Sequence, residues 1–194
     1  MSKSALLVLD LVNELVHEDG KFAGMGYPAQ VKERGVLEAA SSAIGKARAK
    51  GMPVIFVRVG FSPDYRECPE SSPLLGAAKQ YGALQIGDWA TEFHASLDRR
   101  DSDETLTKHR VNAFFGTPLD KILKAKGIDT ILLGGVATDL VVQTTARDGH
   151  DRDYAVVVLE DMCAASSPEL HDSVIGALGA VARIDKTGSA PELN

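Results

Sequence analysis

Short apolar runs alternate with longer amphipathic stretches along most of this 194-residue chain. The runs lie within ALLVLDLVNEL, PVIFVRVG, DTILLGGV, YAVVVLED and the short VARID near the end. Runs rich in Leu, Ile and Val are typical of parallel strands that are buried on both faces. The stretches between them carry apolar residues at helical spacing, as at Val36, Ala40 and Ile44. The pattern predicts an α/β fold in which helices cover both sides of a parallel sheet.

Capping and breaking residues set the expected helix bounds. A helix is predicted over residues 31–50, because a glycine and then a proline follow its last turn in KGMP. Two more are predicted to start after the caps Thr117 and Ser167, each with a proline at its first position. The stretch VVQTTARDGHDRD, residues 141–153, predicts a fourth. Residues 60–107 are expected to be irregular. With no internal repeat, we expect one domain over residues 1–194.

Composition and charge exclude several classes of protein. A formal charge of −6 without a cluster of Lys and Arg argues against binding to nucleic acid. No run approaches the roughly 18 apolar residues of a membrane span, so we expect no membrane contact. Cys68 and Cys163 have no metal-ligand spacing, and no secretory leader is recognised. These features favour a reduced, cytoplasmic setting.

Polar residues stand where the predicted strands end. They are Asp10 after the first strand, Arg58 and Gly60 after the second, residues 134–141 after the third, and Glu160 and Asp161 after the fourth. Lys108 lies shortly before the helix that Thr117 caps. Each residue alone is also explained as a helix cap, a solvated rim or an ion pair. Because ligands of such sheets bind outside the carboxyl ends of the strands, we expect a small-molecule site where these residues converge.

The bend after the third strand poses the main question about function. It reads GGVATDLVV, a strand that runs into two glycines, a bend, and a helix that opens on Thr138 and Asp139. This layout usually displays a reactive side chain at the strand end. The residue in that position is Val141, which cannot attack a substrate, donate a proton or bind a metal. Val141 can help to shape a dry pocket, and the backbone amides of the bend can bind an anion.

Three blocks of the sequence resemble successive motifs of the isochorismatase-like hydrolases, also called the cysteine hydrolase superfamily. They are ALLVLDLVNEL, TKHRVNAFFGTPLDKILKAKGIDTILLGGVATD and TTARDGHDRDYAVVVLEDMCAAS. The resemblance covers nearly the whole chain, and the superfamily includes nicotinamidases, N-carbamoylsarcosine amidases and isochorismatases. It implies a three-layer α/β/α sandwich around a central parallel sheet with Rossmann-like topology. It also implies a homo-oligomer, either a dimer or a tetramer.

In the amidase branch of this family, an Asp, a Lys and a Cys form a catalytic triad. The Asp corresponds to Asp10 and the Lys to Lys108, but the nucleophilic Cys falls on Val141. Neither Cys68 nor Cys163 lies at a position that can replace it. Because a covalent acyl intermediate needs a nucleophile, the resemblance does not predict amide hydrolysis by the usual route.

The isochorismatase branch hydrolyses a vinyl ether and needs an acid in place of a nucleophile. There the residue matching Asp10 delivers a proton to carbon, and the residue matching Lys108 holds and tunes it. A working acid requires that burial, which raises the carboxyl pKa, outweighs the nearby ammonium, which lowers it. The family's isochorismate-binding glutamine and tyrosine correspond to Gly60 and Ala137 here. Isochorismate itself is therefore not favoured as the substrate.

Candidate substrate contacts lie around this predicted site. They are Arg58, Phe61, Trp89, Phe114, Val136, Ala137 and Thr138. The side chain of Arg58 can bind a carboxylate through paired hydrogen bonds or instead form a surface ion pair. The resemblance implies a cis peptide bond between Val136 and Ala137. Metal-binding nicotinamidases carry Asp and His after the second strand, whereas this chain has Asp64 there without a nearby His. We predict no metal and no cofactor.

Three hypotheses about function remain open at this point. The first is a hydrolase of a small metabolite that uses Asp10 as general acid or base with Lys108 and forms no covalent intermediate, as in vinyl ether hydrolysis. The second is a catalytically silent protein that binds or senses a small molecule. The third is an amidase whose cysteine has been replaced by Val141.

Overall fold

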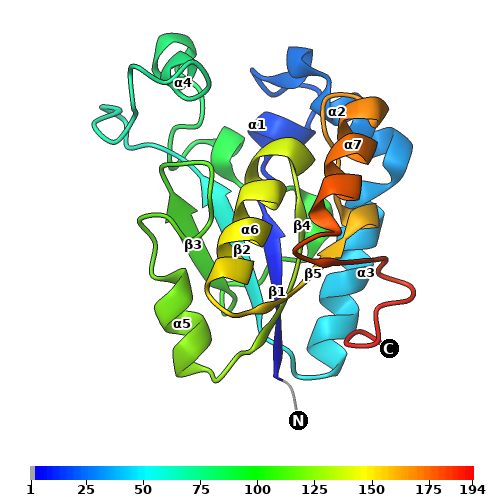
Figure 1. Cartoon of the computed structure of the whole chain (residues 1–194). Coiled ribbons are helices and arrows are strands. Elements are labelled where there is room, and N and C mark those ends of the chain that lie inside the picture. The colour runs from blue at the N-terminus through cyan, green and yellow to red at the C-terminus, as the bar shows by residue number, and fades with distance from the viewer. Residues whose placement is uncertain (1–2) are drawn as a thin grey trace.

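The computed structural model describes residues 3–194 and contains a six-stranded sheet in which all neighbouring strands are parallel (Figure 1). The strands are β1 (Ser4–Leu9), β2 (Val54–Val59), β3 (Glu104–Lys108), β4 (Thr130–Gly135), β5 (Ala155–Leu159) and β6 (Arg183–Asp185). Their order across the sheet is β3-β2-β1-β4-β5-β6. The direction of winding reverses between β1 and β4. In sheets of this Rossmann-like type, ligands bind above that reversal.

Helices cover both faces of the sheet, which confirms the predicted three-layer α/β/α sandwich. Successive strand residues point to opposite faces, so Leu6 and Val8 pack on one side and Leu7 and Leu9 on the other. The first side is covered by α2 (Tyr27–Arg34) and α3 (Val36–Ala49). The second is covered by α5 (Leu119–Ala125), α6 (Gln143–Asp151) and α7 (Pro168–Leu178). All four central strands are therefore buried on both faces.

Two predicted boundaries differ from the structure. The helix expected over residues 31–50 is two helices, because Gly35 between them has φ 66° in the left-handed region and interrupts the first. The stretch 60–107, expected to be irregular, contains most of β3. Strand β3 is an edge strand in which Leu106 is the one buried hydrophobic residue, so it lacks a continuous apolar run.

The helix starts near residues 117 and 167 agree with the predicted cap residues to within two positions. The Ser167 hydroxyl accepts a hydrogen bond from the Leu170 amide, and Pro168 is the first residue of α7. Helix α5 starts at Leu119, whose amide donates to the Thr117 hydroxyl at 3.3 Å.

The remaining elements are short and lie mostly at the carboxyl end of the sheet. They are α1 (Asn13–Val16), α4 (Gly76–Tyr81), 3-10 turns at Ala23–Met25, Trp89–Thr91, Ala95–Leu97 and Glu160–Met162, and a π-helical turn at Thr138–Val142. Figure 1 shows α4, α1 and the start of α2 gathered above the strand ends. Within residues 3–194, no helix is both long enough and apolar enough to cross a bilayer.

Candidate active site

Asp10 joins the carboxyl ends of three strands. It directly follows β1 and has φ 52°, a left-handed conformation that Asp tolerates better than most residues. Its amide donates to the Val57 carbonyl, and its Oδ1 accepts a hydrogen bond of 2.6 Å from the Val59 amide of β2. Its Oδ2 lies 2.7 Å from Nζ of Lys108, the last residue of β3. The carboxylate is therefore fixed by two neighbouring strands.

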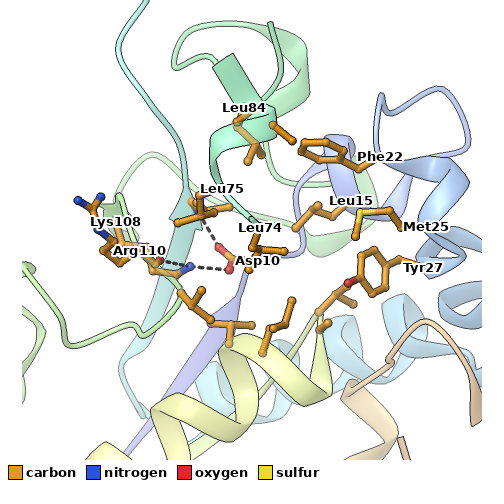
Figure 2. A pocket seen from close by; sticks show the side chains of 18 of the residues that line it. Asp10, Leu15, Phe22, Met25, Tyr27, Leu74, Leu75, Leu84, Lys108 and Arg110 are labelled. Atoms are coloured by element: carbon orange, nitrogen blue, oxygen red, sulfur yellow. Dashed lines mark hydrogen bonds and ion pairs between the residues drawn. The ribbon is translucent and has the colours of Figure 1, made fainter. Parts of the chain in front are cut away.

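The Asp10–Lys108 pair is almost completely removed from water. The two residues are 3% and 2% exposed. The Lys108 ammonium also donates to the Arg110 carbonyl at 3.0 Å, as the dashed lines of Figure 2 show. Burial raises the pKa of the Asp10 carboxyl, and this effect outweighs the lowering by the Lys108 ammonium and by the Val59 amide. Burial is therefore the largest influence on the pKa of this carboxyl, and its direction is the one expected of a proton donor.

Two glycines at the end of β4 allow the bend to lie against its neighbours. A Cβ on Gly135 would overlap the Leu9 carbonyl of β1, and one on Gly134 would overlap Met162. The peptide bond between Val136 and Ala137 is cis. The π-helical turn then leads into α6 and places Val141 beside the end of β1. Turns of this kind inside helices often occur at functional sites.

Asp10, Lys108 and Val141 line one cavity of about 300 Å³ above the switch between β1 and β4. Its other lining residues come mainly from the chain around α1, α2 and α4 and are mostly apolar (Figure 2). They are Leu15, Phe22, Met25, Tyr27, Val59, Pro73, Leu74, Leu75, Ala77, Ala78, Tyr81, Leu84, Arg110, Val111, Val136, Ala137 and Leu140. The volume suits a small molecule.

Five of the predicted site residues meet in this cavity, namely Asp10, Lys108, Val136, Ala137 and Val141. Thr138 lies behind the wall. It is fully buried, and its hydroxyl is 2.9 Å from Nδ1 of His171 on α7. Thr138 therefore holds the bend in place from outside the cavity.

Arg58 and Trp89 do not line the cavity. The guanidinium of Arg58 donates to the Thr107 hydroxyl and to the Thr91 carbonyl, and it forms an ion pair with Glu92 at 3.7 Å. Trp89 is half exposed, and its ring packs edge-on against His17. Arg58 thus has the local ion pair that was one of its two predicted roles.

Phe61 and Phe114 are likewise placed elsewhere. Phe61 is fully buried in a small cluster formed by residues 59–84 and stacks on His109. Phe114 belongs to the core beneath α5 and α6 and stacks on Tyr154. Their placement supports a role in packing rather than in contact with a substrate.

Neither cysteine supplies the missing thiol. Cys163 is fully buried, its thiol donates to the Leu159 carbonyl, and burial raises its pKa to about 12. Cys68 donates to the Leu75 carbonyl within the cluster of residues 59–84. Neither lines the cavity. A thiolate is the reactive form of cysteine, so the Cys163 thiol is held in its inert state.

Some lining residues could not be found from the sequence. Tyr27, Leu74 and Tyr81 line the cavity but are distant in sequence from the ends of the strands. The sequence search for candidates began at those strand ends. Arg110 lies only two residues after Lys108, a proximity that could have drawn attention to it. Among residues 3–194, no three His, Cys, Asp or Glu residues are grouped so as to hold a metal ion.

Comparison with known proteins gives consistent results. Residues 4–185 match the model of the isochorismatase domain. The chain is 36% identical over 172 residues to isochorismatase family protein YecD of Escherichia coli O157:H7, covering 89% of this chain and 85% of that protein. It is 36% identical over 180 residues to ureidoacrylate amidohydrolase RutB of Yersinia enterocolitica, covering 87% and 78%.

A solved structure shares both the fold and part of the sequence. It is the N-carbamoylsarcosine amidase from Thermoplasma acidophilum, with a TM-score of 0.78 and 32% identity. The match covers 97% of this chain and 99% of that one.

Removal of Lys108 should test the energetics of the buried pair. Lys108→Met leaves the Asp10 carboxylate without a counter-charge, so at neutral pH we expect the free energy of unfolding to fall by about 3–5 kcal/mol. The double variant Asp10→Asn/Lys108→Met should recover most of this loss, because a neutral amide needs no counter-charge. Urea unfolding of the three proteins measures both values. A loss below about 1 kcal/mol in the single variant would show that no unpaired charge stays buried there, because Asp10 takes up a proton or water reaches it.

Proposed function

Because the chain belongs to the isochorismatase family, we propose that it is a hydrolase that works by proton transfer at Asp10 and forms no covalent intermediate at residue 141. One observation carries this proposal. The buried carboxyl of Asp10 and the hydrocarbon side chain of Val141 face the same cavity, so an acid is present where the nucleophile is missing.

The position of Val141 restricts the reaction type. Amide hydrolysis through a thioester needs a thiolate at this point, and valine offers only methyl groups. Two relatives are named for the hydrolysis of C–N bonds, as ureidoacrylate amidohydrolase and N-carbamoylsarcosine amidase. We therefore assign a different bond to this chain, an acid-labile C–O bond such as that of an enol ether.

Asp10 has the surroundings of a general acid in such a reaction. Its proton would pass to the terminal alkene carbon of the enol ether and form a new C–H bond there, which leaves an oxocarbenium ion. Water adds to this ion, the resulting hemiketal releases an alcohol and a carbonyl compound, and the proton lost by the water returns to Asp10. The Lys108 ammonium, 2.7 Å from Oδ2, stabilises the carboxylate that exists between the two transfers.

A catalytically silent binding protein is the second candidate. The cavity wall is mostly apolar, and Val141 adds to it, so a ligand can be held there without being altered. A cytoplasmic location and assembly into a dimer or tetramer stay predictions under either function.

Asp10→Asn should separate these two functions. We expect the wild type to hydrolyse a member of a panel of enol ethers that includes isochorismate and phenyl vinyl ether, with pyruvate or phenol release as the readout. Asp10→Asn should lower kcat/KM by about 10²- to 10⁴-fold, because the general acid is lost. Asp64→Asn makes the same chemical change at an exposed residue outside the cavity and should leave the rate unchanged. Thiol reagents should also have no effect.

The pH profile identifies the role of the carboxyl. Because the protonated form is active and the pKa of Asp10 is raised, kcat/KM should fall as the pH increases through that raised value. A rate that increases over the same range would mean that Asp10 acts as a base. Binding without turnover in both proteins would instead support the silent binder.

Val141→Cys should restore part of the amidase chemistry. The new thiol would enter the cavity beside the Asp10–Lys108 pair, so we expect measurable hydrolysis of a neutral amide such as nicotinamide where the wild type has none. Iodoacetamide or a second change, Asp10→Asn, should abolish the gain. Val142→Cys is the matched control, because Val142 is buried in the core and does not line the cavity. Equal activity in the two cysteine variants would refute the assigned position.

A further inference from the structure

No positively charged side chain faces the apolar wall of the cavity. The Lys108 ammonium is held by the Asp10 carboxyl group and also donates to the Arg110 carbonyl. The Arg110 guanidinium donates to the carbonyls of Glu67 and His109, and Figure 2 shows it turned away from Asp10 and from the apolar wall. A carboxylate placed against the apolar wall would lose its hydration without gaining a partner of opposite charge there. The apolar side of the cavity therefore disfavours anions.

The wall opposite the ion pair is hydrocarbon and aromatic. Leu15, Phe22, Met25 and Leu84 surround the side of the cavity away from Lys108 (Figure 2). Apolar groups that leave water for such a wall gain free energy in proportion to the area they bury. An aryl or branched alkyl group is thus favoured at this side.

Tyr27 places one polar atom on that apolar wall. The residue is the first of α2 and is 5% exposed, and Figure 2 shows its hydroxyl facing the cavity across from Asp10. No hydrogen bond described among residues 3–194 uses this hydroxyl. Burial raises the pKa of the phenol, and the Asp139 carboxylate raises it further, so the group stays protonated and can donate. A ligand oxygen that meets this donor at the apolar wall would gain a hydrogen bond.

We propose that the cavity takes an uncharged ligand with an aryl or branched alkyl group, and that the Tyr27 hydroxyl donates a hydrogen bond to a neutral oxygen of that ligand. This inference rests on the proposed function, since it concerns the substrate of the same cavity. It assigns Tyr27 as a specificity-determining residue that holds one end of the substrate while Asp10 meets the other. It also replaces the carboxylate-binding role considered for Arg58 with recognition of a neutral group.

Three probes of similar size and shape separate the effects of charge and polarity. Acetophenone carries a neutral carbonyl oxygen, ethylbenzene lacks it, and benzoate carries a negative charge. Isothermal titration of the wild type at pH 7.5 should give the tightest binding for acetophenone and binding at least about tenfold weaker for benzoate. Tyr27→Phe should weaken acetophenone binding about fivefold, the value of one hydrogen bond, and leave ethylbenzene binding unchanged.

Tyr154→Phe is the matched control variant. It also removes a phenolic hydroxyl, but that hydroxyl donates to Asp120 and lies outside the cavity. We expect unchanged affinity for all three probes. Thermal unfolding checks that both variants are folded before the titrations are compared.

The outcomes distinguish this inference from the proposed function. Benzoate binding tighter than acetophenone, equal affinity of Tyr27→Phe and wild type for acetophenone, or no binding of any probe would each overturn the inference. If the probes behave as expected but no enol ether is hydrolysed, the ligand class stands and the proposed reaction fails. If isochorismate is hydrolysed through Asp10 but benzoate binds best, the reaction stands and the neutral ligand class fails.

Discussion

The site depends on a single ion pair held out of water at the carboxyl end of the sheet. Asp10 accepts a hydrogen bond from β2 and another from the last residue of β3, so three strand ends meet at one carboxylate. Removing a charged pair from water costs free energy, and a protein in which apolar residues replace such a pair is often no less stable. Its presence here is explained better by chemistry than by stability. The apolar cavity above it keeps the carboxyl pKa raised.

The bend after β4 brings residue 141 to the cavity wall, and the residue there is Val141. Close approach to β1 requires Gly135, and the π-helical turn aims residue 141 at the cavity. With a hydrocarbon at its tip, the bend serves as part of the wall. In the reaction proposed above Asp10 is the reactive group, and in the proposed ligand complex Tyr27 donates a hydrogen bond from the opposite wall. Val141 is the position on which the proposed difference from the amidases rests.

The fold and the inner half of the site could be predicted from the sequence, and the outer half could not. Buried parallel strands are continuous apolar runs, so Asp10 and the bend after β4 stand out where those runs stop. Lys108 was assigned through family resemblance, because its edge strand buries only Leu106 and has no such run. A position near a strand end does not show which way the side chain points. The sequence therefore could not show that Arg58 lies outside the cavity. Tyr27 belongs to a wall of loops and short helices whose sequence has no regular spacing of apolar residues.

The most direct test of this account is a carboxyl ¹³C NMR titration of protein labelled at aspartate, with the Asp10 signal assigned by its loss in Asp10→Asn. We predict that this carboxyl titrates above its ordinary pKa of 3.8, because burial outweighs the neighbouring ammonium. It should titrate higher still in Lys108→Met. A pKa at or below 3.8 in the wild type would make Asp10 a permanently ionised partner of Lys108 and would contradict its role as the acid.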